Sequence, residues 1–451
     1  MSNEQQETRR AKALKTSGEQ RGSVAFHTLG CKVNQFDTGG LMAKFRERGY
    51  EIVGFDQPAA IYVINTCTVT QTAEQKARQL IRKVKREHPE AMVVVTGCYA
   101  QTNPEAVAAL PEADLVVGVA GRGNLVDLIE QKISVESKNQ VLPWGNCAQF
   151  EVFTPENTEK TRAFLKIEDG CRSFCSYCKI PFARGPVRSL PPLQVKDEIK
   201  RLLRSGFKEL VLVGIHLGEY GTDLGRDLAS LLAEIAHEGE DWGEEWRLRL
   251  GSLEPTDFSP ALIEILFSSR LFCNHLHIPL QSGSSGVLSR MNRKYTPEDY
   301  AGLVSMLRQG IPDLSLTTDL MVGFPGETEE EFTETLHFIQ AVSFSRIHIF
   351  PYSRREGTKA AQMKEQLPRK LKEERVRQAE KVAEKLARDY REKLLGKTVE
   401  VLIEEVEAGR YGEGFSREYV RVKVEGDWRP NTLVAAKVTS SVGEPLTGIA
   451  I

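Results

Sequence analysis

Three cysteines lie close together near the middle of this 451-residue chain, in the run Cys171-Arg-Ser-Phe-Cys175-Ser-Tyr-Cys178. Spacings of three and two intervening residues let one tight loop reach three corners of a cubane iron-sulfur cluster, and such clusters prefer thiolate ligands. A structural zinc site is the alternative, but zinc sites of this kind use four protein ligands, and this loop offers three cysteines and no histidine. The spacing therefore predicts a 4Fe-4S cluster with one iron left open.

An open iron can chelate the amino and carboxylate groups of S-adenosylmethionine, which is how radical enzymes hold this cofactor for reductive cleavage. The run from Cys171 to Cys178, with Tyr177 before the last cysteine, resembles the signature of the radical S-adenosylmethionine superfamily. The flanking stretches, residues 167–171 and 180–188, look like the methylthiotransferase family within it. The resemblance implies that Tyr177 and later strand ends contact S-adenosylmethionine, and the candidates there are Ser252, Glu254, Gln281 and the stretch 214–221. The alternative for each is ordinary loop and capping chemistry.

A second set of three cysteines is spread along the N-terminal third. Cys31, Cys67 and Cys98 are separated by 36 and 31 residues, and each follows a predicted strand. Parallel strands end on one edge of their sheet, so the three thiols can converge in the crevice where such folds bind ligands. Three separate structural thiols are the alternative. Cys147 and Cys273 match no motif and are expected to be ordinary thiols.

This arrangement also resembles the methylthiotransferases, and the resemblance extends from Val24 to the C-terminus with all six ligand positions matched. It implies an auxiliary 4Fe-4S cluster on the N-terminal cysteines, whose open iron carries the sulfur to be transferred. It also implies that one S-adenosylmethionine methylates this sulfur while a second is cleaved to the radical. Neither step needs an acid-base pair. The cofactors that the resemblance implies are two 4Fe-4S clusters and S-adenosylmethionine.

The elements that must position these cysteines are βα units, which predict an α/β fold. In the N-terminal part, short apolar runs alternate with amphipathic stretches and predict a doubly wound α/β domain with strands at 24–29, 61–64, 92–95 and 115–117 and helices at 36–48, 73–86 and 104–110. In the central part the alternation repeats six times and predicts a partial (β/α)6 barrel with strands at 164–167, 210–213, 248–250, 275–279, 316–321 and 347–350.

The C-terminal part begins with a charged helix whose apolar stripe contains Ala379, Val382, Ala383, Leu386 and Tyr390. Short β-like runs at 399–403, 419–424 and 433–438 then predict a small all-β barrel that resembles a TRAM domain, an RNA-binding module. The predicted boundaries are a disordered lead-in (1–21), an N-terminal domain (22–133), a linker (134–160), a radical S-adenosylmethionine domain (161–363), a connecting helix (364–393) and the TRAM-like domain (394–451).

Composition narrows the class of protein. Hydrophobic residues make up 41% and charged residues 27%, no apolar run is long enough to span a bilayer, and the N-terminus lacks the apolar core of a secretory signal. We therefore expect a cytoplasmic protein without a membrane partner, in which eight cysteines favour metal binding over disulfides. The balance of 60 basic and 62 acidic residues argues against a chain wrapped in nucleic acid, so RNA contacts must come from patches.

The family that the chain resembles includes enzymes that act on three kinds of substrate. These are tRNA adenosines bearing an isopentenyl group, tRNA adenosines bearing a threonylcarbamoyl group, and an aspartate of a ribosomal protein. The stretches Thr28-Leu-Gly-Cys-Lys-Val-Asn-Gln35 and His216-Leu-Gly-Glu-Tyr-Gly221 look like the threonylcarbamoyladenosine branch, whereas the isopentenyl branch tends to have Gln-Met-Asn after the first cysteine. The predicted partners are therefore the tRNA anticodon loop, an external electron donor and a sulfur source. A non-catalytic redox-sensing RNA-binding protein is the alternative from another class.

Basic clusters offer some support for an RNA partner, because they can neutralise phosphates. The candidates are Lys76, Arg78, Arg82, Lys83, Lys85, Arg86, Arg290, Arg293 and Lys294, although a helix face that is simply solvated explains the first six nearly as well. Residues 394–451 contain 7 basic and 9 acidic residues, so any RNA contact there depends on few side chains, with Arg417, Tyr419 and Arg421 as candidates.

Overall fold

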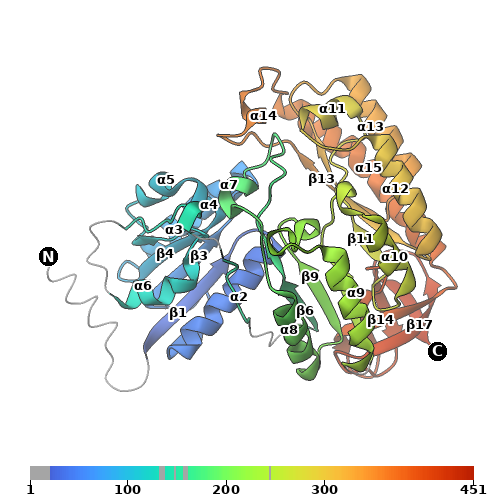
Figure 1. Ribbon diagram of the computed structural model, residues 1–451, viewed down its shortest axis with the longest axis horizontal. Coiled ribbons are helices and arrows are strands. Elements are labelled where there is room, and N and C mark those ends of the chain that lie inside the picture. Colours follow the sequence, from blue (N-terminus) through green and yellow to red (C-terminus); the bar gives the residue numbers. More distant parts are fainter. Residues whose placement is uncertain (1–20, 132–137, 147–148, 156–160, 243–244) are drawn as a thin grey trace, which may run out of the picture.

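The computed structural model describes residues 21–131, 138–146, 149–155, 161–242 and 245–451 (Figure 1). The N-terminal domain is built on a parallel sheet of strand order β2-β1-β3-β4-β5. Its strands are β1 (Arg21–Thr28), β2 (Tyr50–Val53), β3 (Ile61–Thr66), β4 (Met92–Gly97) and β5 (Leu115–Val116). The predicted strands are present, and β2 is an additional edge strand that the sequence analysis did not predict.

Helices cover both faces of this sheet, which confirms the doubly wound α/β fold. Apolar side chains of α2 (Lys32–Glu47) and α6 (Leu125–Glu130) pack on one face, and those of α3 (Gln71–Glu87), α4 (Cys98–Thr102) and α5 (Pro104–Ala108) pack on the other. The strand order reverses direction between β1 and β3. In such sheets ligands bind outside the carboxyl ends of the strands at this switch point.

Where the structure describes it, the region 134–160, predicted to be a linker, packs on the N-terminal domain and also contacts the central domain, where Phe150 lies against the apolar core. Asn139 forms a parallel bridge with Val116 at the free edge of β5. Phe153 is only 5% exposed and joins the apolar core under α2. These segments pack because their apolar side chains cover the sheet, a contact that short-range periodicity does not reveal. Residues 1–20 of the predicted lead-in (1–21) lie outside the described residues, and its last residue, Arg21, belongs to β1.

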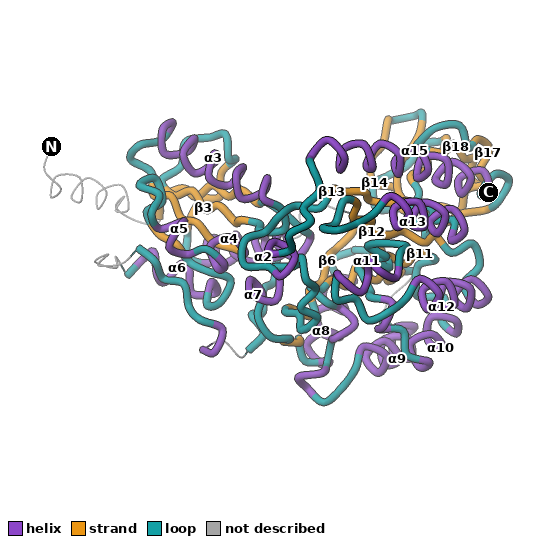
Figure 2. Tube along the Cα trace, turned by 90° about the horizontal axis from the view of Figure 1, so that it is seen from above, coloured by secondary structure: helices purple, strands orange, loops and turns teal. Residues whose placement is uncertain are grey.

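The central domain is a six-stranded partial barrel of parallel strands, as predicted. Its strands are, in spatial order, β6 (Arg162–Lys166), β9 (Glu209–Val213), β10 (Arg247–Leu250), β11 (His275–His277), β12 (Ser315–Val322) and β13 (Arg346–Pro351). The first three form one sheet and the last three another, and isolated bridges join the two sheets between β10 and β11. The main outer helices are α8 (Pro192–Arg204), α9 (Leu228–Glu238), α10 (Pro260–Ser268), α12 (Pro297–Gly310) and α13 (Glu329–Val342), seen around the strands in Figure 2.

Alternate residues of each barrel strand face the helices and the inside. Leu210 and Leu212 join the large core under the helices, whereas Val211 and Val213 lie on the inner face against α2 of the N-terminal domain. Shorter elements decorate the barrel: β7 (Glu168–Asp169), α7 (Ile180–Arg184), β8 (Arg188–Ser189), α11 (Ser285–Arg290) and α14 (Lys359–Gln362). No helix of the described residues is long and apolar enough to cross a membrane.

The connecting helix α15 (Arg369–Lys393) lies along the outside of the barrel beside β13 and α13. Its predicted stripe is buried at Ala379, Ala383, Leu386 and Tyr390, which pack on the barrel or the C-terminal domain, with Val382 partly buried. The helix is further fixed by Arg375, a buried side chain whose Nη1 lies 2.6 Å from an oxygen of Glu327.

The C-terminal domain is a closed five-stranded barrel of order β14-β15-β16-β18-β17, which confirms the predicted all-β barrel. Its strands are β14 (Thr398–Glu407), β15 (Tyr411–Ser416), β16 (Arg421–Glu425), β17 (Leu433–Ser440) and β18 (Leu446–Ala450). Tyr419, predicted at the start of a strand, instead lies in the β15–β16 turn with a positive φ of 62°.

Two arginines of β10 dock this barrel against the central domain. Arg247 donates to the carbonyl oxygens of Glu400 and Phe415, each at 2.8 Å, and Arg249 donates to that of Arg417 at 2.9 Å. Both guanidinium groups also bind the buried carboxylate of Glu209. Burial alone would raise the pKa of Glu209, but Arg249 and Arg247 outweigh it and lower the pKa to about 2.

We expect Glu209→Gln to lower the free energy of unfolding by about 3 kcal/mol, because it leaves two buried arginines without their counter-charge. The native ion pairs contribute fully above about pH 4.5, and this contribution is lost as the pH falls toward 2, through the lowered pKa. Denaturant titration at several pH values measures both effects. Glu405→Gln is the control, because Glu405 is 77% exposed at 3.8 Å from Arg421, and equal stability of the two variants would contradict the prediction.

Candidate functional site

Cys171, Cys175 and Cys178 lie in the loop between β7 and α7, at the carboxyl end of the barrel strands. Gly170 opens the loop with φ of 114°, and a Cβ there would come within 2.1 Å of the carbonyl oxygen of Pro186. The three thiols are close enough to affect one another. Burial raises the pKa of Cys178 to about 12, and the negative charges of Cys175 and Cys171 add to this increase. A metal ion must therefore displace a proton to bind the Cys178 thiolate.

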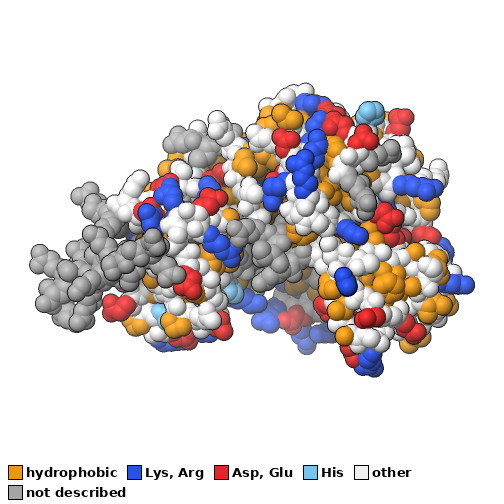
Figure 3. Space-filling view, turned by 90° about the horizontal axis from the view of Figure 1, so that it is seen from below, with side chains coloured by type: hydrophobic (Ala, Val, Ile, Leu, Met, Phe, Trp, Pro, Cys, Tyr) orange, Lys and Arg blue, Asp and Glu red, His pale blue; other side chains and the backbone are white. Residues whose placement is uncertain are grey.

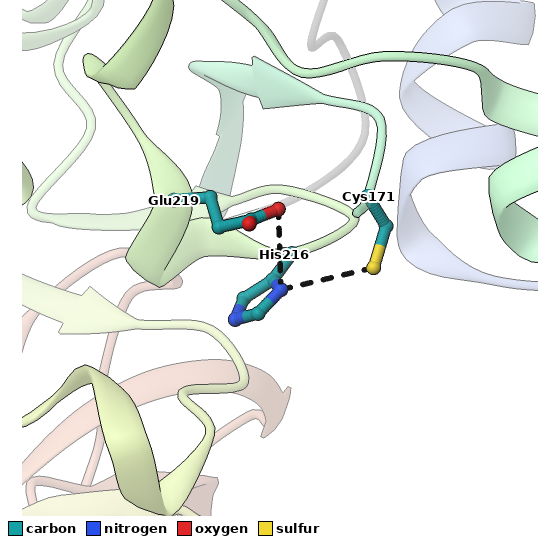
Figure 4. A group of neighbouring side chains, drawn as sticks. All are labelled: Cys171, His216 and Glu219. Atoms are coloured by element: carbon teal, nitrogen blue, oxygen red, sulfur yellow. Dashed lines mark hydrogen bonds and ion pairs between the residues drawn. The ribbon is translucent and has the colours of Figure 1, made fainter. Parts of the chain in front are cut away.

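His216, in the loop after β9, is a charged partner of Cys171 in this cysteine loop. Its Nδ1 lies 3.7 Å from the sulfur of Cys171 and 3.4 Å from Glu219, as Figure 4 shows. Its Nε2 lies 3.0 Å from Asp257. Burial lowers the pKa of His216, but the hydrogen bonds with Asp257 and Cys171 outweigh it and raise the pKa to about 11. Since Asp257 fixes the ring, His216 is placed to stabilise negative charge on the Cys171 sulfur.

The candidate S-adenosylmethionine residues lie around the same loop. Glu254, after β10, pairs with Arg293, whose Nη1 also donates to the sulfur of Cys175 at 3.4 Å. Tyr177 is close to Arg293, and burial raises its pKa well above the ordinary value. Ser252 follows β10 by two residues and Gln281 follows β11 by four, and each forms an isolated parallel bridge with the next barrel strand.

Among these residues, Gln281 shows the clearest structural evidence of a contact with a bound ligand. It adopts a positive φ of 65°, is 7% exposed, and its buried Oε1 has no hydrogen-bond partner among the described residues. An unsatisfied buried acceptor is costly, so a bound polar group would stabilise this arrangement.

Cys31, Cys67 and Cys98 meet at the carboxyl edge of the N-terminal sheet, after β1, β3 and β4. Gly30 packs against Cys67 so closely that a Cβ would lie 2.9 Å from its sulfur. Burial, with the charges of Cys98 and Cys31, raises the pKa of Cys67 to about 11. The convergence that the strand spacing predicted is therefore present.

Both cysteine sets fit an iron-sulfur cluster by donor chemistry. Each offers three thiols and leaves one corner for another ligand, which matches a 4Fe-4S cluster with an open iron. Cys273 is buried beside Arg249, apart from both sets. Cys147 lies outside the described residues.

Arg184 links the two cysteine sets and was missed by the sequence analysis. It ends α7, directly after the Cys171–Cys178 loop, yet its Nε donates to the sulfur of Cys98 at 3.3 Å. Its Nη1 donates to Asp37 of α2 at 3.0 Å and to Asp169 at 3.1 Å. A basic residue six positions after Cys178 gives no sequence signal for a partner in another domain.

The predicted RNA-binding residues divide into exposed and engaged groups. On α3, Lys76, Arg82, Lys83 and Arg86 are exposed. In contrast, the structure places several others in ion pairs or domain contacts: Lys85 with Asp114, Arg290 with Glu331, Arg293 with Glu254, and Arg417 with the carbonyls of Arg270 and Phe272. On the face in Figure 3, basic side chains are interspersed with acidic ones.

Comparison with known proteins agrees with this geometry. The model described as Radical SAM superfamily matches residues 165–339, and that described as Uncharacterized protein family UPF0004 matches residues 23–118. The chain is 43% identical over 412 residues to the threonylcarbamoyladenosine tRNA methylthiotransferase MtaB of Bacillus subtilis (strain 168), covering 90% of each chain. It belongs to the radical S-adenosylmethionine tRNA methylthiotransferases. As a member of this family, the protein is an enzyme that acts on tRNA. Its cofactors are two 4Fe-4S clusters and S-adenosylmethionine.

Other relatives include both substrate branches of the family. The methylthiotransferase is 40% identical to MtaB of Aquifex aeolicus (strain VF5), covering 89% of this chain and 97% of the relative. It is 34% identical to the tRNA-2-methylthio-N(6)-dimethylallyladenosine synthase of Acetivibrio thermocellus, covering 84% and 80%. Among solved structures, the radical S-adenosylmethionine methyltransferase TsrM of Kitasatospora setae matches with a TM-score of 0.57 at 16% identity, over 73% of this chain and 74% of TsrM. This last likeness concerns the fold.

Proposed function

We propose that this enzyme transfers a methylthio group to carbon 2 of N6-threonylcarbamoyladenosine at position 37, next to the tRNA anticodon, and consumes two S-adenosylmethionine molecules. The product is 2-methylthio-N6-threonylcarbamoyladenosine. The 43% identity to the Bacillus subtilis enzyme of that name supports the substrate, and the two cysteine sets support the chemistry. A cytoplasmic location fits both tRNA and reduced thiols.

The observation that carries the proposal is the placement of the two cysteine sets by α2. This helix begins directly after Cys31, and Val33 in its first turn packs on Val211 and Val213 inside the barrel. The N-terminal sheet edge that holds Cys31, Cys67 and Cys98 is therefore brought to the carboxyl end of the barrel, where β/α barrels bind substrates.

The proposed division of labour follows from this placement. Cys171, Cys175 and Cys178 would hold the cluster that binds S-adenosylmethionine, with Tyr177, Ser252, Glu254 and Gln281 as its further contacts. Cys31, Cys67 and Cys98 would hold the auxiliary cluster. When bound, these groups supply the radical and the sulfur, with electrons and sulfur from external donors. The protein's own contribution is to orient the base between the two sets and to exclude water.

Nucleoside mass spectrometry of tRNA from a deletion strain tests the substrate. We expect the 2-methylthio-N6-threonylcarbamoyladenosine peak to disappear, N6-threonylcarbamoyladenosine to accumulate, and the peak to return when the gene is restored. Restoration with a Cys171→Ala variant is the control, because it should not return the peak.

An unchanged peak would overturn the proposed substrate. Loss of the methylthio-isopentenyladenosine peak, or of methylthio-aspartate in a ribosomal protein, would instead assign the chemistry to the other branches of the family. A purely redox-sensing RNA-binding protein would release no 5'-deoxyadenosine when incubated anaerobically with S-adenosylmethionine and a reductant.

A further inference from the structure

Lys32 is carried onto the inner face of the partial barrel by the neighbouring Val33, which packs there on Val213. Its Nζ lies 5.7 Å from the ring centre of Phe164 in β6 and 6.0 Å from that of Tyr419 in the β15–β16 turn. The side chain therefore joins all three domains, because it comes from the N-terminal domain and points between the barrel and the C-terminal domain.

The charge of Lys32 is not neutralised by an acidic partner among the described residues. The nearby Arg162 pairs with Glu404 at 2.7 Å, and Arg249 pairs with Glu209 at 2.8 Å, so their charges are compensated. Lys32 is exposed, and its ammonium group lies over two aromatic rings of the described part of the chain. It is thus a cation available to a ligand.

The inner face beside Lys32 is polar, whereas barrel interiors are usually filled by branched apolar side chains. Thr317 Oγ1 lies 3.0 Å from His275 Nε2 and 2.9 Å from His277 Nδ1. His277 Nε2 lies 3.5 Å from Asp319, and its ring centre is 6.0 Å from that of His348. These five residues with Lys32 and Tyr419 form what we call the inner-face cluster.

One member of this cluster has an unsatisfied polar atom. His275 is 6% exposed, and its Nδ1 has no hydrogen-bond partner among the described residues. Its ring lies 4.8 Å from that of Tyr419. Burial would raise the pKa of Tyr419, but Lys32, Arg162 and Arg249 outweigh it and lower the pKa. The surroundings of the Tyr419 hydroxyl therefore favour a negatively charged group.

We propose that Lys32 binds the carboxylate of the threonylcarbamoyl group while the inner-face cluster hydrogen-bonds its hydroxyl and urea-like atoms. This proposal rests on the proposed function. The threonylcarbamoyl substituent carries one carboxylate, one hydroxyl, one carbonyl and one N–H group, whereas an isopentenyl group has no polar atom. An apolar substituent would leave Lys32 and the buried Nδ1 of His275 unpaired, so the same side chains also select against it.

The position of Lys32 in the sequence agrees with this role. It follows Cys31 directly, and the substituted nitrogen and carbon 2 lie on the same edge of adenine. A side chain next to a ligand of the sulfur-carrying cluster can therefore contact the substituent while carbon 2 faces the cluster.

Binding of synthetic anticodon stem-loops to the reconstituted full-length enzyme tests the proposal. The three RNAs carry unmodified adenosine, N6-threonylcarbamoyladenosine, or its methyl ester, which lacks the negative charge. We expect the wild type to bind the free acid about tenfold more tightly than the ester. Lys32→Gln should abolish that preference, and Lys32→Arg should restore most of it.

Lys83→Gln on the exposed face of α3 is the matched control, because it removes the same charge far from the cluster and should leave the acid-to-ester ratio unchanged. Iron content of Lys32→Gln shows that the clusters are retained. A wild type that binds the acid and the ester equally, or a Lys32→Gln variant that keeps the preference, would overturn the role of Lys32. A wild type that does not distinguish either modified RNA from unmodified adenosine would instead contradict the proposed substrate.

Discussion

Replacing Cys31, Cys67 and Cys98 together by alanine is expected to halve the iron per chain and to reduce methylthio transfer to background, while S-adenosylmethionine cleavage continues. The reason is that the two cysteine sets belong to different domains: the first follows β1, β3 and β4 of the N-terminal sheet, and the second lies between β7 and α7. Each set should therefore lose its metal independently of the other. Iron analysis and 5'-deoxyadenosine release measure the two consequences.

The reciprocal variant, with Cys171, Cys175 and Cys178 replaced, should also retain half of the iron but release no 5'-deoxyadenosine. Cys273→Ala is the control, because this thiol is buried away from both sets and its loss should leave the iron content unchanged. Loss of all iron from the first variant would show that the six thiols do not form two separate sites.

Local patterns predicted the elements that hold these cysteines because each pattern lies within one strand or one loop. The apolar runs before Cys31, Cys67 and Cys98 give buried parallel strands, and their equal position in the βα unit places the thiols on one edge. The same reasoning failed for β15 (Tyr411–Ser416). Its Gly412 and Gly414 lack the apolar side chains of a strand pattern, because Ile403 and Leu402 of β14 occupy that space.

Contacts between residues far apart in the sequence were beyond sequence reasoning for a different physical reason. Arg184 lies 86 residues from Cys98, and His216 lies 45 residues from Cys171, so neither pair leaves a local spacing. Tyr419 was predicted as a candidate RNA contact of the C-terminal barrel, and the structure places its ring on Phe415 and beside His275 of the central domain. Side chains that connect domains resemble ordinary surface residues until the domains are placed together.

The largest of these connections is a buried ion cluster centred on Asp37 of α2. Asp37 lies 2.6 Å from Lys166 of β6, 3.0 Å from Arg184 of α7 and 2.6 Å from Arg122 of the N-terminal domain. Asp169 supplies a second carboxylate at 3.2 Å from Lys166 and 3.1 Å from Arg184. Burial would raise the pKa of Asp37, but Arg122, Lys166 and Arg184 outweigh it and lower the pKa, so the carboxylate is charged.

Asp37→Asn is therefore expected to lower the free energy of unfolding by about 3 to 5 kcal/mol, since it keeps the shape but leaves buried cations with too little negative charge. Because the same residues hold α2 on the barrel, we also expect methylthio transfer to fall further than S-adenosylmethionine cleavage. Denaturant titration and the ratio of methylthio product to 5'-deoxyadenosine measure these two effects.

Two further variants separate this interpretation from a general loss of packing. Glu47→Gln removes an exposed charge from the end of the same helix and should change the free energy of unfolding by less than about 0.5 kcal/mol. Adding Lys166→Met to Asp37→Asn should recover part of the lost stability, because it removes one of the uncompensated cations. If the double variant is instead less stable than Asp37→Asn, the cost comes from packing, and the charge balance of this cluster does not hold the two domains together.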